Sequence, residues 1–386
     1  MPADRNDRRP TVWIVTRDLG KFSEVWLLRQ ILNMRRLRPV VVTWADHRRE
    51  KDRIPVHVLP FPPDLGVGPA RWTNRLSRMA GGNYFASGGA ELRALKELAR
   101  RDPPDVILGH FGHTALRALP LARSLGVPMV CHFHGLDLSS SLNNRWYRWS
   151  LQRHAPHFAA AVTVGTRQRE MLAPFYPPER TALIPCGVPV AEFTRDAVPL
   201  PGVRFTTVSR LVPQKGVDHC LRALAELPRG MAHLDVIGDG PERAGLEALT
   251  DRLGLGAEVV FHGAQPPSGV RAALGQSTAL LQHSLDAPDG WFEGFGVTVA
   301  EASAMEVPTI ASRCGGLLDQ VVDGETGFLV PQRDHKAMAA AMHKLAEDPV
   351  LQARMGRAAR ERAEAMFDMK DQVAKLEDLL LAEVRG

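Results

Sequence analysis

Two glutamates enclose a glycine-containing stretch in the second half of the chain, where residues 293–301 read EGFGVTVAE. On one continuous helix, eight residues correspond to about 800° of rotation, so the Glu293 and Glu301 side chains would point about 80° apart. Gly294 and Gly296 disfavour helix, whereas the residues that follow do not. We therefore expect a glycine loop that runs into a helix N-terminus, an arrangement that offers backbone amides to an anion.

A second candidate site lies in VSRLVPQKG (208–216), directly after a predicted strand. A guanidinium that binds in a bidentate manner and an ammonium group five residues apart can grip a diphosphate, which would give Arg210 and Lys215 a shared ligand. The alternative is that both are solvated surface cations beside a turn.

Two glycine turns also follow predicted strands, in IGDGPER (237–243) and VFHGAQP (260–266). Each is either a plain connection to the next helix, with Pro241 at a first helical position, or a backbone wall for a nucleotide base. In the second interpretation Gly238, His262 and Gly263 present their backbone to that base.

Histidines gather at predicted strand ends in the first half, in GHFGH (109–113) and HFHG (132–135). There His110 and His134 either reach a ligand or donate to backbone groups in the core. The pairs 110/113, 132/134 and 154/157 suggest a metal ion, but no carboxylate has ligand spacing and no cysteine pair supports zinc. We therefore expect no metal.

Length and composition describe a globular protein of 386 residues, which suits two domains better than one core. We find no apolar run of eighteen residues, and the charged N-terminus lacks the apolar segment of a signal peptide. The four cysteines are widely spaced, as is usual in a reducing compartment. These features favour a cytoplasmic location.

Charge is distributed unevenly, with 29 Lys and Arg against 16 Asp and Glu in residues 1–195 and the reverse imbalance, 19 against 27, in the remainder. The basic half indicates an anionic partner, either a membrane surface, a phosphorylated acceptor or nucleic acid, unless its arginines are simply solvated. No motif with aromatics suited to base stacking is present, which argues against nucleic acid. We expect docking on the anionic inner face of the membrane through residues 71–101, which contain Arg71, Trp72, Arg75, Leu76, Arg78, Arg93 and Arg100.

Apolar, β-branched runs alternate with helical periodicity along the whole chain, and this pattern predicts an α/β protein with parallel, doubly wound sheets. A polar, proline-containing linker at 192–202 interrupts the alternation, which then restarts. The predicted organisation is a Rossmann-like domain over 1–193, a second over 203–366, and a C-terminal helix over 367–386 that packs back towards the first. Ligands of open parallel sheets bind beyond the strand C-termini, in a cleft that the two domains would face.

The segments VSRLVPQKG, IGDGPER and EGFGVTVAEASAMEVPTIAS, in this order, resemble the retaining glycosyltransferases of family 4, which have the GT-B fold. The match covers nearly the whole second domain. In the first domain FSEVWLLRQI (22–31), GHFG and HFHGLD (132–137) resemble the branch that builds bacterial exopolysaccharides of the colanic-acid type.

The resemblance implies a role for each matching residue. Glu301 would bind the ribose hydroxyls of the donor, Glu293 the donor sugar, and the amides of Phe295 to Val297 its diphosphate. Arg210 and Lys215 would neutralise charge on the leaving nucleoside diphosphate. The remaining implied contacts are His134 on the donor sugar near C6, with His110, Ser23 and Glu24 on the acceptor side.

The implied activity is transfer of a hexosyl group from a UDP- or GDP-hexose to a glycan or a polyprenyl-diphosphate-linked saccharide, with no metal or other cofactor. Two alternatives remain, a GT-B sugar-nucleotide epimerase or phosphorylase and a catalytically silent nucleotide-sugar-binding partner. The loop TRDLGKFSE (16–24) departs from the family by having one glycine where a pair is frequent. The base, the sugar, the linkage and the acceptor stay open.

Overall fold

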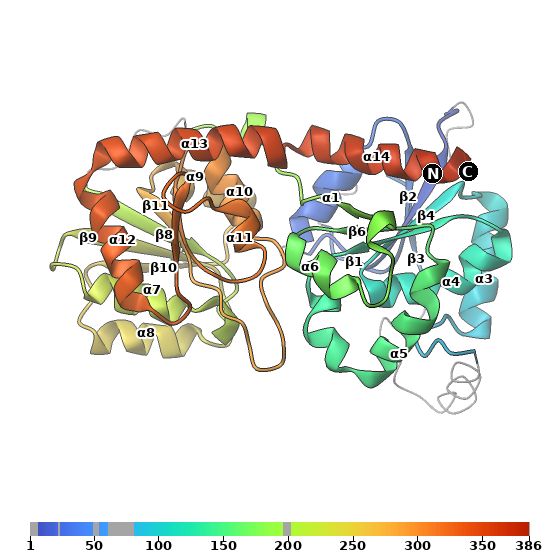
Figure 1. The fold of residues 1–386 in the computed structure, drawn as a ribbon, viewed down its shortest axis with the longest axis horizontal. Coiled ribbons are helices and arrows are strands. Elements are labelled where there is room, and N and C mark those ends of the chain that lie inside the picture. The colour runs from blue at the N-terminus through green and yellow to red at the C-terminus, as the bar shows by residue number, and fades with distance from the viewer. Residues whose placement is uncertain (1–6, 22–23, 49–53, 61–80, 196–201, 386) are drawn as a thin grey trace. The chain divides into compact units, whose positions relative to one another are not determined.

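The computed structural model describes residues 7–21, 24–48, 54–60, 81–195 and 202–385. The chain forms two compact units, residues 1–187 with 369–386 (unit 1) and residues 188–368 (unit 2) (Figure 1). Ser23 and residues 71–80 of the expected membrane segment lie outside the described residues. No described helix is both long and apolar enough to cross a bilayer.

Unit 1 contains a parallel seven-stranded sheet of order β3-β2-β1-β4-β5-β6-β7. Its strands are β1 (Thr11–Leu19), β2 (Arg38–Asp46), β3 (Val56–Val58), β4 (Val106–His110), β5 (Met129–Phe133), β6 (Ala160–Thr163) and β7 (Thr181–Leu183). Its α-helices are α1 (Val25–Leu32), α3 (Gly89–Arg101), α4 (Gly112–Leu125), α5 (Arg145–His154), α6 (Thr166–Leu172) and α14 (Met369–Arg385). Every residue of β4 and β5 is buried, as expected for parallel strands that are covered on both faces.

Unit 2 contains a second parallel sheet of six strands in the order β10-β9-β8-β11-β12-β13. The strands are β8 (Val203–Val208), β9 (Ala232–Ile237), β10 (Val259–Gly263), β11 (Ala279–Gln282), β12 (Thr309–Ser312) and β13 (Gly327–Val330). The helices are α7 (Val217–Ala225), α8 (Arg243–Arg252), α9 (Pro267–Gly275), α10 (Val297–Ala304), α11 (Leu317–Gln320), α12 (His335–Glu347) and α13 (Pro349–Phe367). The predicted fold class, two α/β units with parallel sheets, is confirmed.

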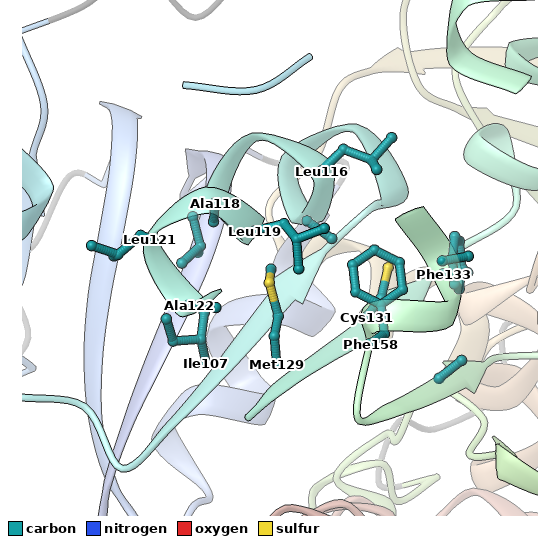
Figure 2. Close-up of a cluster of buried hydrophobic side chains, with 14 of the residues drawn as sticks. Ile107, Leu116, Ala118, Leu119, Leu121, Ala122, Met129, Cys131, Phe133 and Phe158 are labelled. Atoms are coloured by element: carbon teal, nitrogen blue, oxygen red, sulfur yellow. The ribbon is translucent and has the colours of Figure 1, made fainter. Parts of the chain in front are cut away.

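The core of unit 1 shows how its strands divide their side chains between the two faces of the sheet. Met129, Cys131 and Phe133 on β5 lie in one apolar cluster with Leu116 and Leu119 of α4 (Figure 2). Successive side chains of a strand alternate between faces. The residues between them, including His132, therefore point to the opposite face.

The expected boundary at residue 193 is too late, because the chain enters unit 2 at Val188. Val188 and Phe193 are buried in an apolar cluster with Phe367. The Val188 N–H donates to the Phe367 carbonyl at 2.8 Å, and the Arg360 guanidinium donates to the Phe193 carbonyl at 2.8 Å. The polar composition predicted a linker over 192–202. The unit boundary lies earlier, at Val188, because Val188 and Phe193 are buried in and hydrogen-bonded to unit 2.

Helix α14 packs within unit 1, where its Glu377 carboxylate is buried against the turn before β2. Glu377 is 2% exposed, and its Oε1 accepts the backbone N–H groups of Arg35 at 3.0 Å, Arg36 at 2.7 Å and Leu37 at 2.9 Å. These groups belong to the turn before β2. The buried Glu377 carboxylate therefore connects the C-terminal helix to the first βαβ unit through three backbone hydrogen bonds.

We expect Glu377→Ala to destabilise unit 1 by about 2–3 kcal/mol, because it leaves three backbone donors without their charged acceptor. The matched control is Asp378→Ala, since the neighbouring Asp378 pairs with Arg36 at the surface, where the two side chains are 67% and 47% exposed. That change should stay within about 0.5 kcal/mol. Urea unfolding followed by circular dichroism measures both, and equal losses would contradict the role of Glu377.

Candidate active site

The centre of the candidate site in unit 2 is an ion pair between Lys215 and Glu293. The Lys215 ammonium donates to Glu293 Oε2, and the two side chains are 15% and 8% exposed. The Ser284 hydroxyl donates to the same oxygen at 2.8 Å, and the Gln282 amide donates to Ser284 Oγ at 3.0 Å. Glu293 is therefore oriented by both a cation and a hydroxyl.

The sheet topology explains why these residues meet. Strand order reverses between β8 and β11, which are hydrogen-bonded neighbours, and Lys215 follows β8 whereas Ser284 follows β11. Ligands of open parallel sheets bind outside the strand C-termini at such a reversal. Sequence reasoning missed Ser284 and Gln282, although both stand at the end of a predicted strand, which is the signal that identified the other residues.

The turn that carries Lys215 depends on the glycine after it. Gly216 has φ of +57°, and a Cβ at this position would lie 2.2 Å from the His283 carbonyl oxygen. The Leu285 N–H donates to the Gln214 carbonyl at 2.8 Å. Backbone contact therefore fixes the Lys215 turn to the end of β11.

The predicted glycine turn after β9 packs against the segment that carries Arg210. Gly238 has φ of +137°, and a Cβ there would lie 1.8 Å from the Ser209 carbonyl oxygen. The Leu211 N–H donates to the Asp239 carbonyl at 2.9 Å, and the Gly238 N–H donates to the Gly263 carbonyl at 2.9 Å. Gly238 and Gly263 thus lie side by side next to Arg210, whose side chain is exposed.

His262 is oriented by a buried carboxylate that sequence reasoning did not single out. Asp235 in β9 bonds His262 Nε2 at 2.7 Å and accepts the Arg204 guanidinium at 2.8 Å. The Gln265 side-chain amide donates to the His262 carbonyl at 2.8 Å. The His262 ring and its carbonyl therefore both have partners within unit 2.

The loop of the two glutamates lies directly on a second glycine segment. The Gly316 N–H donates to the Glu293 carbonyl at 2.8 Å, and a Cβ on Gly315 would lie 2.1 Å from that same oxygen. A Cβ on Gly316 would lie 2.2 Å from the Gly294 carbonyl oxygen. Glycine at both positions is what allows this close approach.

Helix α10 begins at Val297, with Gly296 as its N-cap and Glu301 buried in its second turn. The Val297 N–H already donates to the Phe295 carbonyl at 3.1 Å. Among the described residues, the N–H groups of Phe295 and Gly296 have no acceptor. Of the expected amide set, these two N–H groups at the start of the helix are therefore the ones still available to an anion.

The predicted histidines of unit 1 also come together. His110 ends β4 and pairs in register with His132 of β5, and His110 Nδ1 lies 2.9 Å from His134 Nε2. The Trp26 ring of α1 packs on His134 with 4.2 Å between centroids. Burial lowers the pKa of His110 to about 3 and that of His132 and His134 well below the usual value, so all three rings are neutral at pH 7.

Asp137 positions the loop that carries His134, a role that sequence reasoning did not assign. Its carboxylate accepts the N–H groups of Gly112 at 2.9 Å, His134 at 3.0 Å and Gly135 at 3.0 Å. Burial raises the pKa of Asp137 to about 6, against the opposing effect of these hydrogen bonds. Of the acceptor-side candidates, Glu24 precedes α1 and has a pKa raised by burial.

Both halves of the chain match models of one enzyme family. Residues 25–192 match Glycosyltransferase Family 4, and residues 196–362 match Glycosyl transferases group 1. The GDP-mannose-dependent alpha-(1-6)-phosphatidylinositol monomannoside mannosyltransferase of Mycolicibacterium smegmatis is 31% identical over 287 residues, which are 70% of this chain and 75% of that protein. The chain belongs to glycosyltransferase family 4. It is therefore a retaining glycosyltransferase with a nucleotide-sugar donor.

Two further comparisons concern a polysaccharide enzyme and the fold. The putative colanic acid biosynthesis glycosyltransferase WcaL of Salmonella typhimurium is 29% identical over 257 residues, which are 62% of this chain and 60% of that protein. The crystal structure of Alr3699/HepE from Anabaena in complex with UDP has a TM-score of 0.78 at 20% identity, covering 97% of this chain and all of that one. The GT-B fold expected for this family 4 enzyme is confirmed.

We expect Gly238→Ala to displace the Arg210 segment and to abolish nucleotide-dependent stabilisation, because its Cβ would overlap the Ser209 carbonyl. The control is Gly245→Ala in α8, where a Cβ meets open space and should stabilise the helix by up to about 1 kcal/mol. Thermal unfolding with UDP, GDP and their sugars measures both variants. A ligand at 100-fold its Kd should raise the free energy of unfolding of the wild type by about 2.7 kcal/mol. The nucleotide that gives the larger increase at equal concentration identifies the preferred base. An unchanged response in Gly238→Ala would contradict this account.

Proposed function

We propose that this enzyme transfers a hexosyl group from a UDP- or GDP-hexose to a glycan or a polyprenyl-diphosphate-linked saccharide in the synthesis of a cell-surface polysaccharide. The ion pair between the partly buried Lys215 and the buried Glu293, at the strand reversal of unit 2, carries the proposal. Two relatives support the pathway, the putative colanic acid biosynthesis glycosyltransferase of Salmonella typhimurium and the amylovoran biosynthesis glycosyltransferase of Erwinia amylovora. HepE, crystallised with UDP-glucose, supports the donor class.

In this proposal the two glutamates bind opposite ends of one donor. Glu293, held by Ser284 and Lys215, accepts hydrogen bonds from the sugar hydroxyls, and Glu301 binds the ribose. The amides of Phe295 and Gly296 meet the diphosphate between them, where the start of α10 favours negative charge.

The cations would stabilise the charge that develops as the glycosidic bond to the diphosphate breaks. Arg210 is exposed and available for a bidentate contact, whereas Lys215 would exchange part of its contact with Glu293 for the phosphate. One preorganised group of this kind contributes about 3–4 kcal/mol of transition-state stabilisation. Protein groups thus neutralise the negative charge on the leaving diphosphate, and we propose no metal or cofactor for the reaction. His134 would contact the donor sugar, with His110 and Glu24 towards the acceptor.

We expect Lys215→Gln to lower kcat by 100-fold or more while it keeps a hydrogen-bond donor for Glu293 and hence the fold. Lys215→Ala should lose at least as much activity, and circular dichroism checks that it stays folded. Lys336→Ala, an exposed lysine of α12, is the matched control and should leave kcat unchanged. Sugar transfer to added acceptor measures all three, and an unchanged kcat in Lys215→Gln would refute the assigned role.

A lipid-linked acceptor would bring unit 1 to an anionic membrane surface. Exposed basic residues of α3 and α5 support this partner, and α5 also exposes Trp149 beside Arg148. Aromatic and basic side chains together suit the interface of an anionic bilayer.

We expect the chain to float with vesicles that contain phosphatidylglycerol and not with purely zwitterionic vesicles, because the attraction is mainly electrostatic. Arg145→Ala with Arg148→Ala and Trp149→Ala should reduce flotation, whereas Arg222→Ala of α7 in unit 2 should not. Equal flotation with both lipids would contradict the membrane partner.

A further inference from the structure

We propose that His110, His132 and His134 form a binding site for a zinc ion at the C-terminal edge of the unit 1 sheet. The site goes beyond the proposed function, which contains no metal. The sequence argued against a metal because it offers no carboxylate at ligand spacing and no cysteine pair. The sheet register instead joins one histidine of β4 with two from β5 and its following loop.

The three rings are close enough to share one ion. Each offers a ring nitrogen, and the three nitrogens lie within 4.8 Å of one another, with His110 Nδ1 and His134 Nε2 at 2.9 Å. Zinc binds imidazole nitrogen at about 2.0–2.1 Å, so the ligands of a tetrahedral ion lie roughly 3.3 Å apart. The observed nitrogen separations, 2.9 Å for one pair and at most 4.8 Å for the others, bracket that value.

Buried nitrogens without partners are the second observation that points to a ligand. His132 is 1% exposed, and neither of its ring nitrogens has a hydrogen-bond partner among the described residues. The same holds for His110 Nε2 and His134 Nδ1. Leaving a buried polar atom without a partner is unfavourable, and coordination would remove part of that penalty.

The surroundings restrict the ion to metals that accept imidazole. Asp137 directs its carboxylate to backbone N–H groups, and Cys131 points into the apolar cluster under α4 (Figure 2). Trp26 covers the cluster, with its ring 4.2 Å from His134 and 5.8 Å from His110. Three neutral imidazoles without a carboxylate suit zinc, copper or nickel and not magnesium or calcium.

The outer nitrogens also set the expected affinity. Ligating histidines normally donate their second N–H to a carbonyl or carboxylate, and the loss of such partners lowers metal affinity by 10–100-fold. We therefore expect reversible binding, about 10–100-fold weaker than at a zinc site whose histidines have such partners. An ion on His134 would keep that ring from the donor sugar, so zinc should inhibit transfer while the chelated enzyme is fully active.

Cobalt(II) titration of the full, untagged chain tests the site, because Co²⁺ in a tetrahedral site absorbs visible light and zinc displaces it. We expect one equivalent to bind, His132→Ala to weaken binding by at least 10-fold, and the control His157→Ala, at an exposed surface position, to bind as the wild type does. His110→Gln is a second variant in case His132→Ala unfolds. Wild-type affinity no higher than that of folded His132→Ala or His110→Gln would overturn the site.

A transfer assay separates this inference from the proposed function. Zinc should inhibit the wild type and His157→Ala, EDTA should restore full activity, and folded His132→Ala should resist inhibition. An enzyme that is inactive with every donor would contradict the proposed function. The cobalt titration would still show whether the three histidines bind a metal ion. Zinc inhibition that is equal in wild type and His132→Ala would show that the inhibitory ion binds elsewhere and would overturn the inhibitory role.

Discussion

A largely desolvated ammonium–carboxylate pair organises the strand C-termini of unit 2. Lys215 and Glu293 are 78 residues apart, and each is largely removed from water. Removing water from two charges is costly, and their attraction offsets the cost only with good geometry and further hydrogen bonds. Ser284 and Gln282 supply those hydrogen bonds. The ends of β8 and β11 and the glutamate loop are therefore held together.

Close backbone packing provides the geometry that this pair needs. Gly216, Gly238 and Gly315 have positive φ and lie where a Cβ would overlap a carbonyl oxygen of the neighbouring loop. Four separate segments can therefore approach to hydrogen-bonding distance at one sheet edge. Rigid strands fix where the loops start, and the glycines decide how near they come.

At the C-terminal edge of its sheet, unit 1 carries a cluster of buried, neutral imidazoles. Burial keeps His110, His132 and His134 uncharged, and Asp137 holds the loop of His134 through three backbone hydrogen bonds. A neutral imidazole has one nitrogen that donates and one that accepts a hydrogen bond or coordinates a metal, and both of our proposals for His134 depend on that state. The C-terminal helix α14 stabilises the same unit through Glu377.

The sequence by itself determined the fold class, the family and the segments that carry the site, because apolar runs of β-branched residues and glycine turns at strand ends are local signals. Only the tertiary structure decided which strand ends are neighbours. Strand order reverses between β8 and β11, and this brings Ser284 to Glu293, while Asp235 meets His262 across β9 and β10. The histidine cluster and the boundary at Val188 likewise depend on contacts between residues 24 and 179 positions apart, such as His110 with His134 and Val188 with Phe367. Periodicity reports which face of an element is buried, whereas sheet order and packing determine what that face touches.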